Sequence, residues 1–204
     1  MHAIGLTGSF CSGKTFVLKV LEEQGCYTMR ADDLAKNIIF SRDSPVLQEI
    51  IAAFGPGIYD PEKGLDKEKF SSLLFEDCEK RNLVNTIVHP LVSEERQKKI
   101  RAIEATRLYD FLIYESALLL ESGIYKEFEK IIVVYASQAV QLRRAMERDK
   151  LTRAEAQKRI RSQFPLREKL KVANYTIDSG GTCENTRAST MEVFHLLKKD
   201  FNLH

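Results

Sequence analysis

The stretch Gly8-Ser9-Phe10-Cys11-Ser12-Gly13-Lys14-Thr15 is a complete G-x-x-x-x-G-K-[ST] pattern. Before it stands a short apolar run, residues 3–7, which is typical of a buried parallel strand. After it, apolar residues recur at helical spacing: Val17, Leu18 and Leu21. A strand, a glycine-bearing loop and a helix in this order are the setting in which the pattern binds phosphate. The sequence therefore predicts a phosphate-binding loop (P-loop) that takes a nucleoside triphosphate.

The residue types of the loop fit this chemistry. Glycines let successive backbone N–H groups point inward at phosphate oxygens, and the helix that begins near Lys14 adds its positive end. The Lys14 ammonium is expected to reach the β- and γ-phosphates, and the Thr15 hydroxyl to hold Mg²⁺. The predicted nucleotide contacts are Gly8, Ser9, Phe10, Cys11, Ser12, Gly13, Lys14 and Thr15.

Composition and charge restrict the class of protein. The chain has 204 residues, 44% of them hydrophobic and 29% charged, which suffices for one globular unit without disulfides. Its 31 basic and 29 acidic residues give a net charge of +2, so nothing global indicates nucleic acid or an acidic membrane as partner. The sequence has no CxxC pair, and its hydropathy and first residues lead us to expect neither a membrane span nor a signal peptide. We expect a cytoplasmic protein with no obligate protein partner and four reduced cysteines: Cys11, Cys26, Cys78 and Cys183.

Short apolar runs alternate with helical patterns along the chain. This alternation predicts an α/β fold with a parallel sheet covered on both faces. Ligands of such sheets bind at the carboxyl ends of the strands, so the loops after Thr7, Met29, Tyr114 and Tyr135 are expected to line one site. The predicted strands are 3–7, 26–29, 111–114, 130–135 and 175–177; the predicted helices are 14–24, 33–40, 46–54, 67–75, 91–106, 139–148, 152–163 and a C-terminal one.

Two segments stand out from this alternation. The helical block between about 45 and 106 is either a substrate-binding subdomain or a set of extra helices packed on the sheet. From Arg143 to Lys171 there are eleven basic residues against four acidic ones. That run is either a solvated helical face or an electrostatic funnel for a polyanion such as a triphosphate.

The size and motifs favour a small-molecule kinase. No Asn-Lys-x-Asp motif is present, which argues against a GTPase, and 204 residues leave little room for a motor or transporter module. Asp32 and Asp33 follow the second strand, where one carboxylate caps the next helix and the other is placed to accept a proton from an acceptor hydroxyl. Glu115 ends the third strand, either as a magnesium-site acid or as a surface carboxylate.

Arg144 and His89 complete the candidates. Arg144 lies one turn before Arg148 on a predicted helix and can neutralise charge on the transferring phosphoryl group; the alternative is a surface ion pair with a neighbouring acid. His89 precedes Pro90 and, taken alone, is more often structural than catalytic.

Five further segments follow the P-loop in a fixed order. They are Ala31-Asp32 with Leu34-Ala35-Lys36; Ile87-Val88-His89-Pro90-Leu91; Leu118-Leu119-Leu120-Glu121-Ser122-Gly123; Gln141-Leu142 with Arg144; and Arg148-Asp149 with Arg159-Ile160 and Gln163. In this order and spacing, from Ile4 to about Gly181, the chain resembles the dephospho-CoA kinases, the P-loop enzymes of the last step of coenzyme A synthesis. Single segments are weak evidence, whereas their succession is specific.

The resemblance implies a P-loop fold of three α/β/α layers with a helical substrate-binding insertion and a helical lid. The core would be about 1–40 and 107–204, the insertion 45–106, and the lid with the helices that follow it 139–171, all within one unit. The implied reaction is phosphorylation of the ribose 3′-hydroxyl of dephospho-CoA by ATP with Mg²⁺, giving CoA and ADP. The implied catalytic residues are Asp32, Lys14 and Arg144, and the implied substrate contacts are Asp32, His89, Glu115 and Leu118.

Three positions depart from the family's pattern. Arg30 stands where the family often has an aspartate, and Glu115 with Ser116-Ala117 replaces an aspartate and a proline. Ser179 replaces an asparagine near the end of the chain. Two alternatives stay open at this point: a P-loop kinase of a nucleoside monophosphate or small alcohol, and a non-catalytic ATP-binding module.

Overall fold

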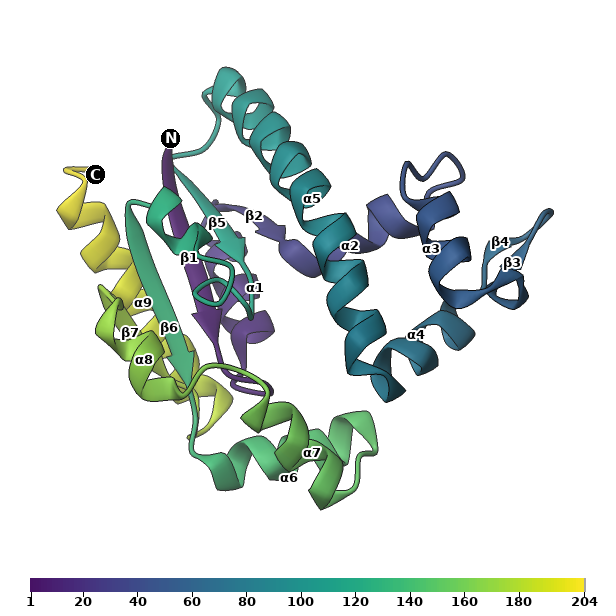
Figure 1. Ribbon diagram of the computed structural model, residues 1–204. Helices are drawn as coiled ribbons and strands as arrows, with labels where there is room; N and C mark the ends of the chain where they lie inside the picture. Colours follow the sequence, from purple (N-terminus) through teal and green to yellow (C-terminus); the bar gives the residue numbers. More distant parts are fainter. Residues whose placement is uncertain (204) are drawn as a thin grey trace. The chain divides into compact units, whose positions relative to one another are not determined.

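The computed structural model describes residues 1–203, apart from the side chains of Phe75, Glu76 and Cys78, so the prediction for the Cys78 thiol lies outside the described residues. The chain divides into two compact units (Figure 1). The first joins Met1–Arg30 to the segment from Thr106 onward, and the second is Ala31–Ala105. No helix of residues 1–203 has both the length and the apolar character that crossing a bilayer requires.

The first unit is built on a five-stranded sheet in the order β2-β5-β1-β6-β7. Every pairing in it is parallel, which confirms the predicted sheet. Because the strands are parallel, all of them end at one edge, and the loops that follow them meet there. The strands are β1 (His2–Gly8), β2 (Tyr27–Arg30), β5 (Phe111–Glu115), β6 (Lys130–Tyr135) and β7 (Tyr175–Asp178).

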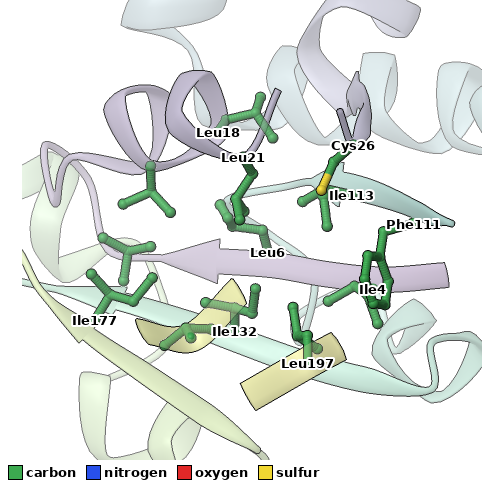
Figure 2. Close-up of a cluster of buried hydrophobic side chains, with 13 residues drawn as sticks. Ile4, Leu6, Leu18, Leu21, Cys26, Phe111, Ile113, Ile132, Ile177 and Leu197 are labelled. Carbon is green, nitrogen blue, oxygen red and sulfur yellow. The ribbon is translucent and has the colours of Figure 1, made fainter. Parts of the chain in front are cut away.

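Helices α1 (Lys14–Glu23) and α9 (Cys183–Asp200) cover one face of this sheet. Leu18 and Leu21 of α1 and Leu197 of α9 pack against strand residues such as Leu6 and Ile132, all of them buried (Figure 2). Alternate strand residues supply this face because side chains point to opposite faces at successive positions. The P-loop between β1 and α1 is thus fixed at both ends in the main core.

The other face is covered by the chain between β5 and β6 together with α8 (Leu166–Lys171). A Cβ on Gly5 would lie 2.8 Å from the side chains of both Ile131 and Leu119, so the covering layer packs directly on the backbone of β1. Tyr114 of β5 stacks on Phe128, with ring centroids 5.4 Å apart. Both faces are therefore covered, as the three-layer prediction required. A short 3₁₀ helix, η2 (Ile124–Glu127), lies in this segment.

Lys169 of α8 is buried in this second layer. Its side chain has no exposed surface, and its Nζ lies 3.1 Å from a carboxylate oxygen of Glu121 and donates to the carbonyl of Ala117 at 2.6 Å. Burial lowers the pKa of Lys169, and the Glu121 carboxylate opposes that shift. Glu121 also accepts a hydrogen bond from the backbone N–H of Phe164 at 2.8 Å. One buried ion pair thus ties α8 and the segment before it to the turn after β5.

Replacing Lys169 by methionine is expected to lower the free energy of unfolding by about 3 kcal/mol, because removing one partner leaves the largely buried Glu121 carboxylate uncompensated. Urea unfolding followed by far-UV circular dichroism measures the loss. Lys171→Met is the matched control, since Lys171 lies on the same helix in an exposed pair with Glu168. Its unfolding curve is expected to match the wild type. Equal effects of the two substitutions would contradict a structural role for the buried pair.

Helices α6 (Gln138–Asp149) and α7 (Arg153–Arg161) follow β6. The side chain of Ser137 caps α6 by accepting from the N–H of Val140. At the start of α7 the Thr152 hydroxyl accepts from the N–H of Glu155, whose carboxylate accepts from the N–H of Thr152. This reciprocal pair is a capping box, for which the Thr-x-x-Glu spacing of the sequence is the signature. We call residues 139–163, which contain most of α6 and all of α7, the lid segment, whereas α8 belongs to the layer that covers the sheet.

The second unit has its own core. It is formed by buried side chains from α2 (Ala31–Phe40), α3 (Leu47–Phe54), α4 (Lys67–Glu76), α5 (Cys78–Thr106) and the 3₁₀ helix η1 (Pro56–Ile58). The glycine- and proline-rich stretch between α3 and α4 also holds a hairpin of β3 (Tyr59–Asp60) and β4 (Gly64–Leu65). The second unit begins at Ala31, so all of α2 lies in it.

Helix α5 corrects one prediction. The sequence indicated a helix that starts at Leu91, after Pro90, but the helix runs unbroken from Cys78 and contains Pro90. Proline lacks the N–H that would bond to the carbonyl four residues earlier, so it normally ends or kinks a helix. Val84 and Val88 of the preceding turns are buried in the unit's core. Their packing holds the first half of the helix in line and outweighs the loss at Pro90.

Candidate functional site

The P-loop has the backbone that its glycines predict. Gly13 has φ 86°, a left-handed conformation, and a Cβ there would lie 2.9 Å from the Ser179 hydroxyl. At Gly8 a Cβ would lie 2.1 Å from the carbonyl oxygen of Val134. Any side chain at either position would displace the loop. The Ser12 hydroxyl is buried and has no hydrogen-bond partner among residues 1–203, so it is a donor within the loop that an anion can use.

Lys14 lies at the start of α1 with its ammonium folded over the loop. Its Nζ donates to the carbonyls of Gly8 and Ser9, each at 3.2 Å. The same nitrogen is 3.9 Å from a carboxylate oxygen of Glu115, whose side chain is only 6% exposed. Arg30 approaches that carboxylate from β2, with Nε 3.4 Å from the other oxygen. Glu115 therefore lies between two cations, which stabilise its charge at a nearly dry position.

This arrangement follows from the register of the sheet. Arg30 and Glu115 are direct partners across the β2–β5 ladder, and Leu6 of β1 pairs with Glu115 on its other side. Arg30 and Glu115, which both depart from the family's pattern, thus form one ion pair in which the arginine compensates the buried carboxylate. The sequence alone gave no sign of this pairing, because it did not give the strand order.

Arg144 connects α6 to the P-loop and to the loop after β7. One of its terminal nitrogens donates to the hydroxyl of Ser179 at 3.1 Å and lies 3.4 Å from the carbonyl of Cys11, while the other donates to the Ser179 carbonyl at 2.6 Å. The Ser179 hydroxyl in turn donates to the carbonyl of Ser12 at 2.6 Å. Arg144 is therefore held at the loop by named contacts, and the alternative of a surface ion pair is not what the structure shows.

A cavity of about 440 Å³ opens beside this cluster. Residues of the P-loop, α6 and the start of α9 line it: Cys11, Gly13, Phe16, Arg144, Glu147, Arg148, Ser179, Gly181, Cys183 and Thr186. Its volume suits a purine nucleoside, because ligand pockets of this kind start at about 300 Å³. The P-loop forms one wall, so a nucleotide whose phosphates occupy the loop can place its base here.

The donor groups at the loop fit a hydrated Mg²⁺ that arrives with a nucleotide. The Thr15 side chain is exposed at the first turn of α1, and Glu115 supplies a carboxylate at the same edge of the sheet. Mg²⁺ usually keeps several waters and takes one or two protein oxygens plus phosphate oxygens. Among the side chains that the structure describes, no group of three or more His, Cys, Asp or Glu is arranged to hold a metal. A metal bound jointly by phosphate and protein is the arrangement these residues suit.

The remaining candidates are Leu118 in the first unit and Asp32, Asp33 and His89 in the second. Leu118 is half-buried in the turn after β5, where its carbonyl accepts from Ser122. Asp32 and Asp33 are exposed in the first turn of α2. The sequence predicted a helix from Asp33 that one of the two carboxylates caps. The helix starts at Ala31 instead, so both carboxylates lie in its first turn, where the helix dipole favours negative charge. His89 is exposed on α5 rather than preceding a helix.

Sequence reasoning missed Ser179 as a site residue. It was noted only as a departure from an asparagine, yet its hydroxyl and carbonyl hold Arg144, and the hydroxyl also bonds to the P-loop. The available signal was the predicted strand 175–177, since the loop after any strand of a parallel sheet reaches the binding edge. Phe10 and Gln163 were predicted separately, and their contact, described below, could not be read from residues 153 positions apart.

Cys11 is expected to react slowly for a thiol beside so many cations. Burial raises its pKa, and the nearby Arg148 only partly offsets that effect, so the thiolate fraction at neutral pH is small. In iodoacetamide labelling at pH 7.5, followed by peptide mass spectrometry, Cys11 should be modified at least about tenfold more slowly than Cys183. The rate at Cys11 should rise as the pH increases toward its elevated pKa. Cys183, exposed in the same cavity, is the internal control; equal rates would contradict the prediction.

Comparison with known proteins gives a consistent result. The family model described as dephospho-CoA kinase matches residues 2–185 of the chain. A dephospho-CoA kinase of Shouchella clausii is 39% identical over 183 residues, covering 90% of this chain and 92% of its own. One of Aquifex aeolicus is 34% identical over 200 residues, covering 98% and 100%. The solved dephospho-CoA kinase of Campylobacter jejuni superposes with a TM-score of 0.72 at 26% identity, covering 97% of this chain and 98% of that one.

Proposed function

Because the chain belongs to the dephospho-CoA kinase family, we propose that it transfers the γ-phosphoryl group of ATP to the ribose 3′-hydroxyl of dephospho-CoA, giving CoA and ADP. The observation that carries the proposal is the phosphate loop with Lys14 and Arg144 already held at it. Phosphoryl transfer requires little covalent chemistry from the protein, so positioning and charge stabilisation account for most of the rate. The P-loop, Lys14 and Arg144 supply both the positioning and the charge stabilisation.

On this proposal the cavity binds the adenosine of ATP and the P-loop binds its phosphates. The adenosine occupies the cavity beside Arg144, and the phosphates lie along residues 8–15, where backbone N–H groups and the Ser12 hydroxyl donate to them. The Lys14 ammonium exchanges the carbonyls of Gly8 and Ser9 for the β- and γ-phosphate oxygens. Arg144 donates to the transferring group from α6. Each of these donors is near its place before the ligand binds, which reduces the entropy lost on binding.

Mg²⁺ would be held by the Thr15 hydroxyl and by phosphate oxygens, with Glu115 orienting a water in its shell. When bound, the metal neutralises charge on the β- and γ-phosphates. Arg30 has a separate role here, because it stabilises the Glu115 carboxylate whether or not a cation lies on the other side.

We propose that Asp32, two residues beyond the end of β2, interacts with the acceptor hydroxyl. Its carboxylate would orient the 3′-hydroxyl and take its proton late in the transfer. His89 and Leu118 are proposed to contact the rest of the acceptor. We further propose a location in the cytoplasm, since widely spaced cysteines without a CxxC pair suit a reducing compartment.

The direct test is ADP release in a coupled assay with Mg-ATP, run with and without dephospho-CoA. We expect acceptor-dependent turnover of about 1–100 s⁻¹, the usual kinase range. Chromatography against authentic CoA identifies the product. ADP release that is independent of dephospho-CoA but stimulated by a nucleoside monophosphate or a small alcohol would assign the fold to another acceptor. Calorimetric ATP binding without turnover of any acceptor would indicate a nucleotide-dependent binding module instead.

A further inference from the structure

Phe10 is the second residue of the P-loop's variable stretch, and its backbone and ring both contact the lid segment. Its N–H donates to the side-chain oxygen of Gln163 at 2.7 Å. Its half-buried ring packs beside a small apolar cluster in which Cys11 meets Leu142, Ala145 and Ala156. Helices α6 and α7, beyond the carboxyl end of β1 (Figure 1), are thus attached to the phosphate loop itself.

Two arginines of the lid segment share the Phe10 ring. The guanidinium carbon of Arg148, on α6, is 5.9 Å from the ring centroid, and that of Arg159, on α7, is 5.5 Å from it. Both distances lie within the range in which a ring's electron-rich face attracts a cation. Bringing two like charges to one side chain costs electrostatic energy, and the ring, together with Asp149 bound to Arg148 through two contacts, offsets part of that cost.

An aliphatic side chain at position 10 would fill the same space but would not attract the two arginines. Leucine at position 10 can pack against Leu151 and Ile160, the other partly buried members of the cluster. It has no ring face, so it cannot hold a guanidinium by its quadrupole. Space filling therefore explains an apolar residue here, whereas an aromatic ring also attracts the two arginines that approach it from different helices, in addition to the attraction of Asp149 for both.

We propose that Phe10 is a positioning residue for phosphoryl transfer: its ring holds Arg148, which lines the cavity beside the P-loop, and Arg159 near the triphosphate that the loop binds. The residue acts through the two arginines and not on the phosphates. The inference rests on the proposed function for its kinetic consequence, and on the contacts of Phe10 for its geometry. It assigns a reason to an aromatic side chain in a loop where the motif itself requires none.

The test compares F10L, which keeps apolar volume, with F10Y, which keeps the ring. We expect F10L to lower kcat by about 3- to 30-fold, corresponding to the loss of one or two cation–π contacts, with a smaller change in the KM for dephospho-CoA. The loss in F10Y should be several-fold smaller. Thermal unfolding of both variants should match the wild type within about 2 °C. F10L kinetics within twofold of F10Y would overturn the proposal.

A double-mutant cycle with R159Q separates positioning from packing. If Phe10 acts through Arg159, F10L should cost less in the R159Q background than in the wild type, because the contact is already absent. Full additivity of the two losses, in this cycle and in the equivalent one with R148Q, would contradict the inference. ATP affinity by calorimetry gives a readout independent of the acceptor: weaker binding by F10L than by F10Y supports the role of the ring even if dephospho-CoA proves not to be the substrate.

Discussion

Replacing Lys14 by methionine is expected to lower kcat/KM for ATP by about 10²- to 10⁴-fold. The ammonium would donate to oxygens of two phosphates, and charge-assisted hydrogen bonds are each worth about 1.5–3 kcal/mol. The ammonium would also stabilise the negative charge that develops on the γ-phosphoryl oxygens in the transition state. Its removal should therefore lower kcat as well as the affinity for ATP. Methionine keeps the length of the side chain, which limits the disturbance at the start of α1. The coupled assay and calorimetric ATP titration measure the two components.

The same substitution removes one of the two cations beside Glu115. Arg30 remains at 3.4 Å and continues to compensate that carboxylate, so we expect the fold to survive and the far-UV circular dichroism spectrum to be unchanged. Lys19→Met is the matched control, because Lys19 is an exposed lysine on the same helix. It should leave kcat and KM within about twofold of the wild type. Near-normal turnover in Lys14→Met would refute the assignment of the P-loop.

The P-loop and the sheet were predictable from sequence because their determinants are local. Gly13 has the left-handed backbone, with φ 86°, that the glycine of the motif supplies, and the apolar runs of β1, β5 and β6 are short and buried, as parallel strands are. Helix caps were predictable for the same reason: Thr152 and Glu155 lie three residues apart and satisfy each other.

What could not be predicted depends on contacts between distant residues. Strand order brings Arg30 beside Glu115, and Ser179 reaches Arg144 and Ser12 only because β7 lies at the edge next to β6. The continuous helix through Pro90 is a case where tertiary burial outweighs a local rule, since the proline's cost is met by the packing of neighbouring turns. Patterns in the sequence define each element; they do not define which elements touch.

Replacing Asp32 by asparagine is expected to lower kcat by about 10²- to 10⁴-fold, the usual contribution of a positioned acid or base, while ATP affinity stays near the wild-type value. Asparagine keeps the shape of the side chain and can still bond to the acceptor hydroxyl, but it cannot take the proton. Transfer through a loose transition state needs that proton late, so part of the effect is orientation, and kcat should fall more than the KM for dephospho-CoA changes. Steady-state kinetics with each substrate varied in turn measures kcat and the KM for dephospho-CoA separately.

Asp33→Asn is the internal comparison. Asp33 is the next residue in the same exposed first turn of α2, so it matches Asp32 in backbone setting, exposure and proximity to the helix dipole. A role in helix stability would make the two substitutions alike, whereas a role in catalysis makes Asp32 the far more sensitive. If Asp32→Asn keeps more than a tenth of the wild-type kcat, Asp32 is a helix-terminal carboxylate only. A larger loss in Asp33→Asn than in Asp32→Asn would move the acceptor assignment one residue along the chain.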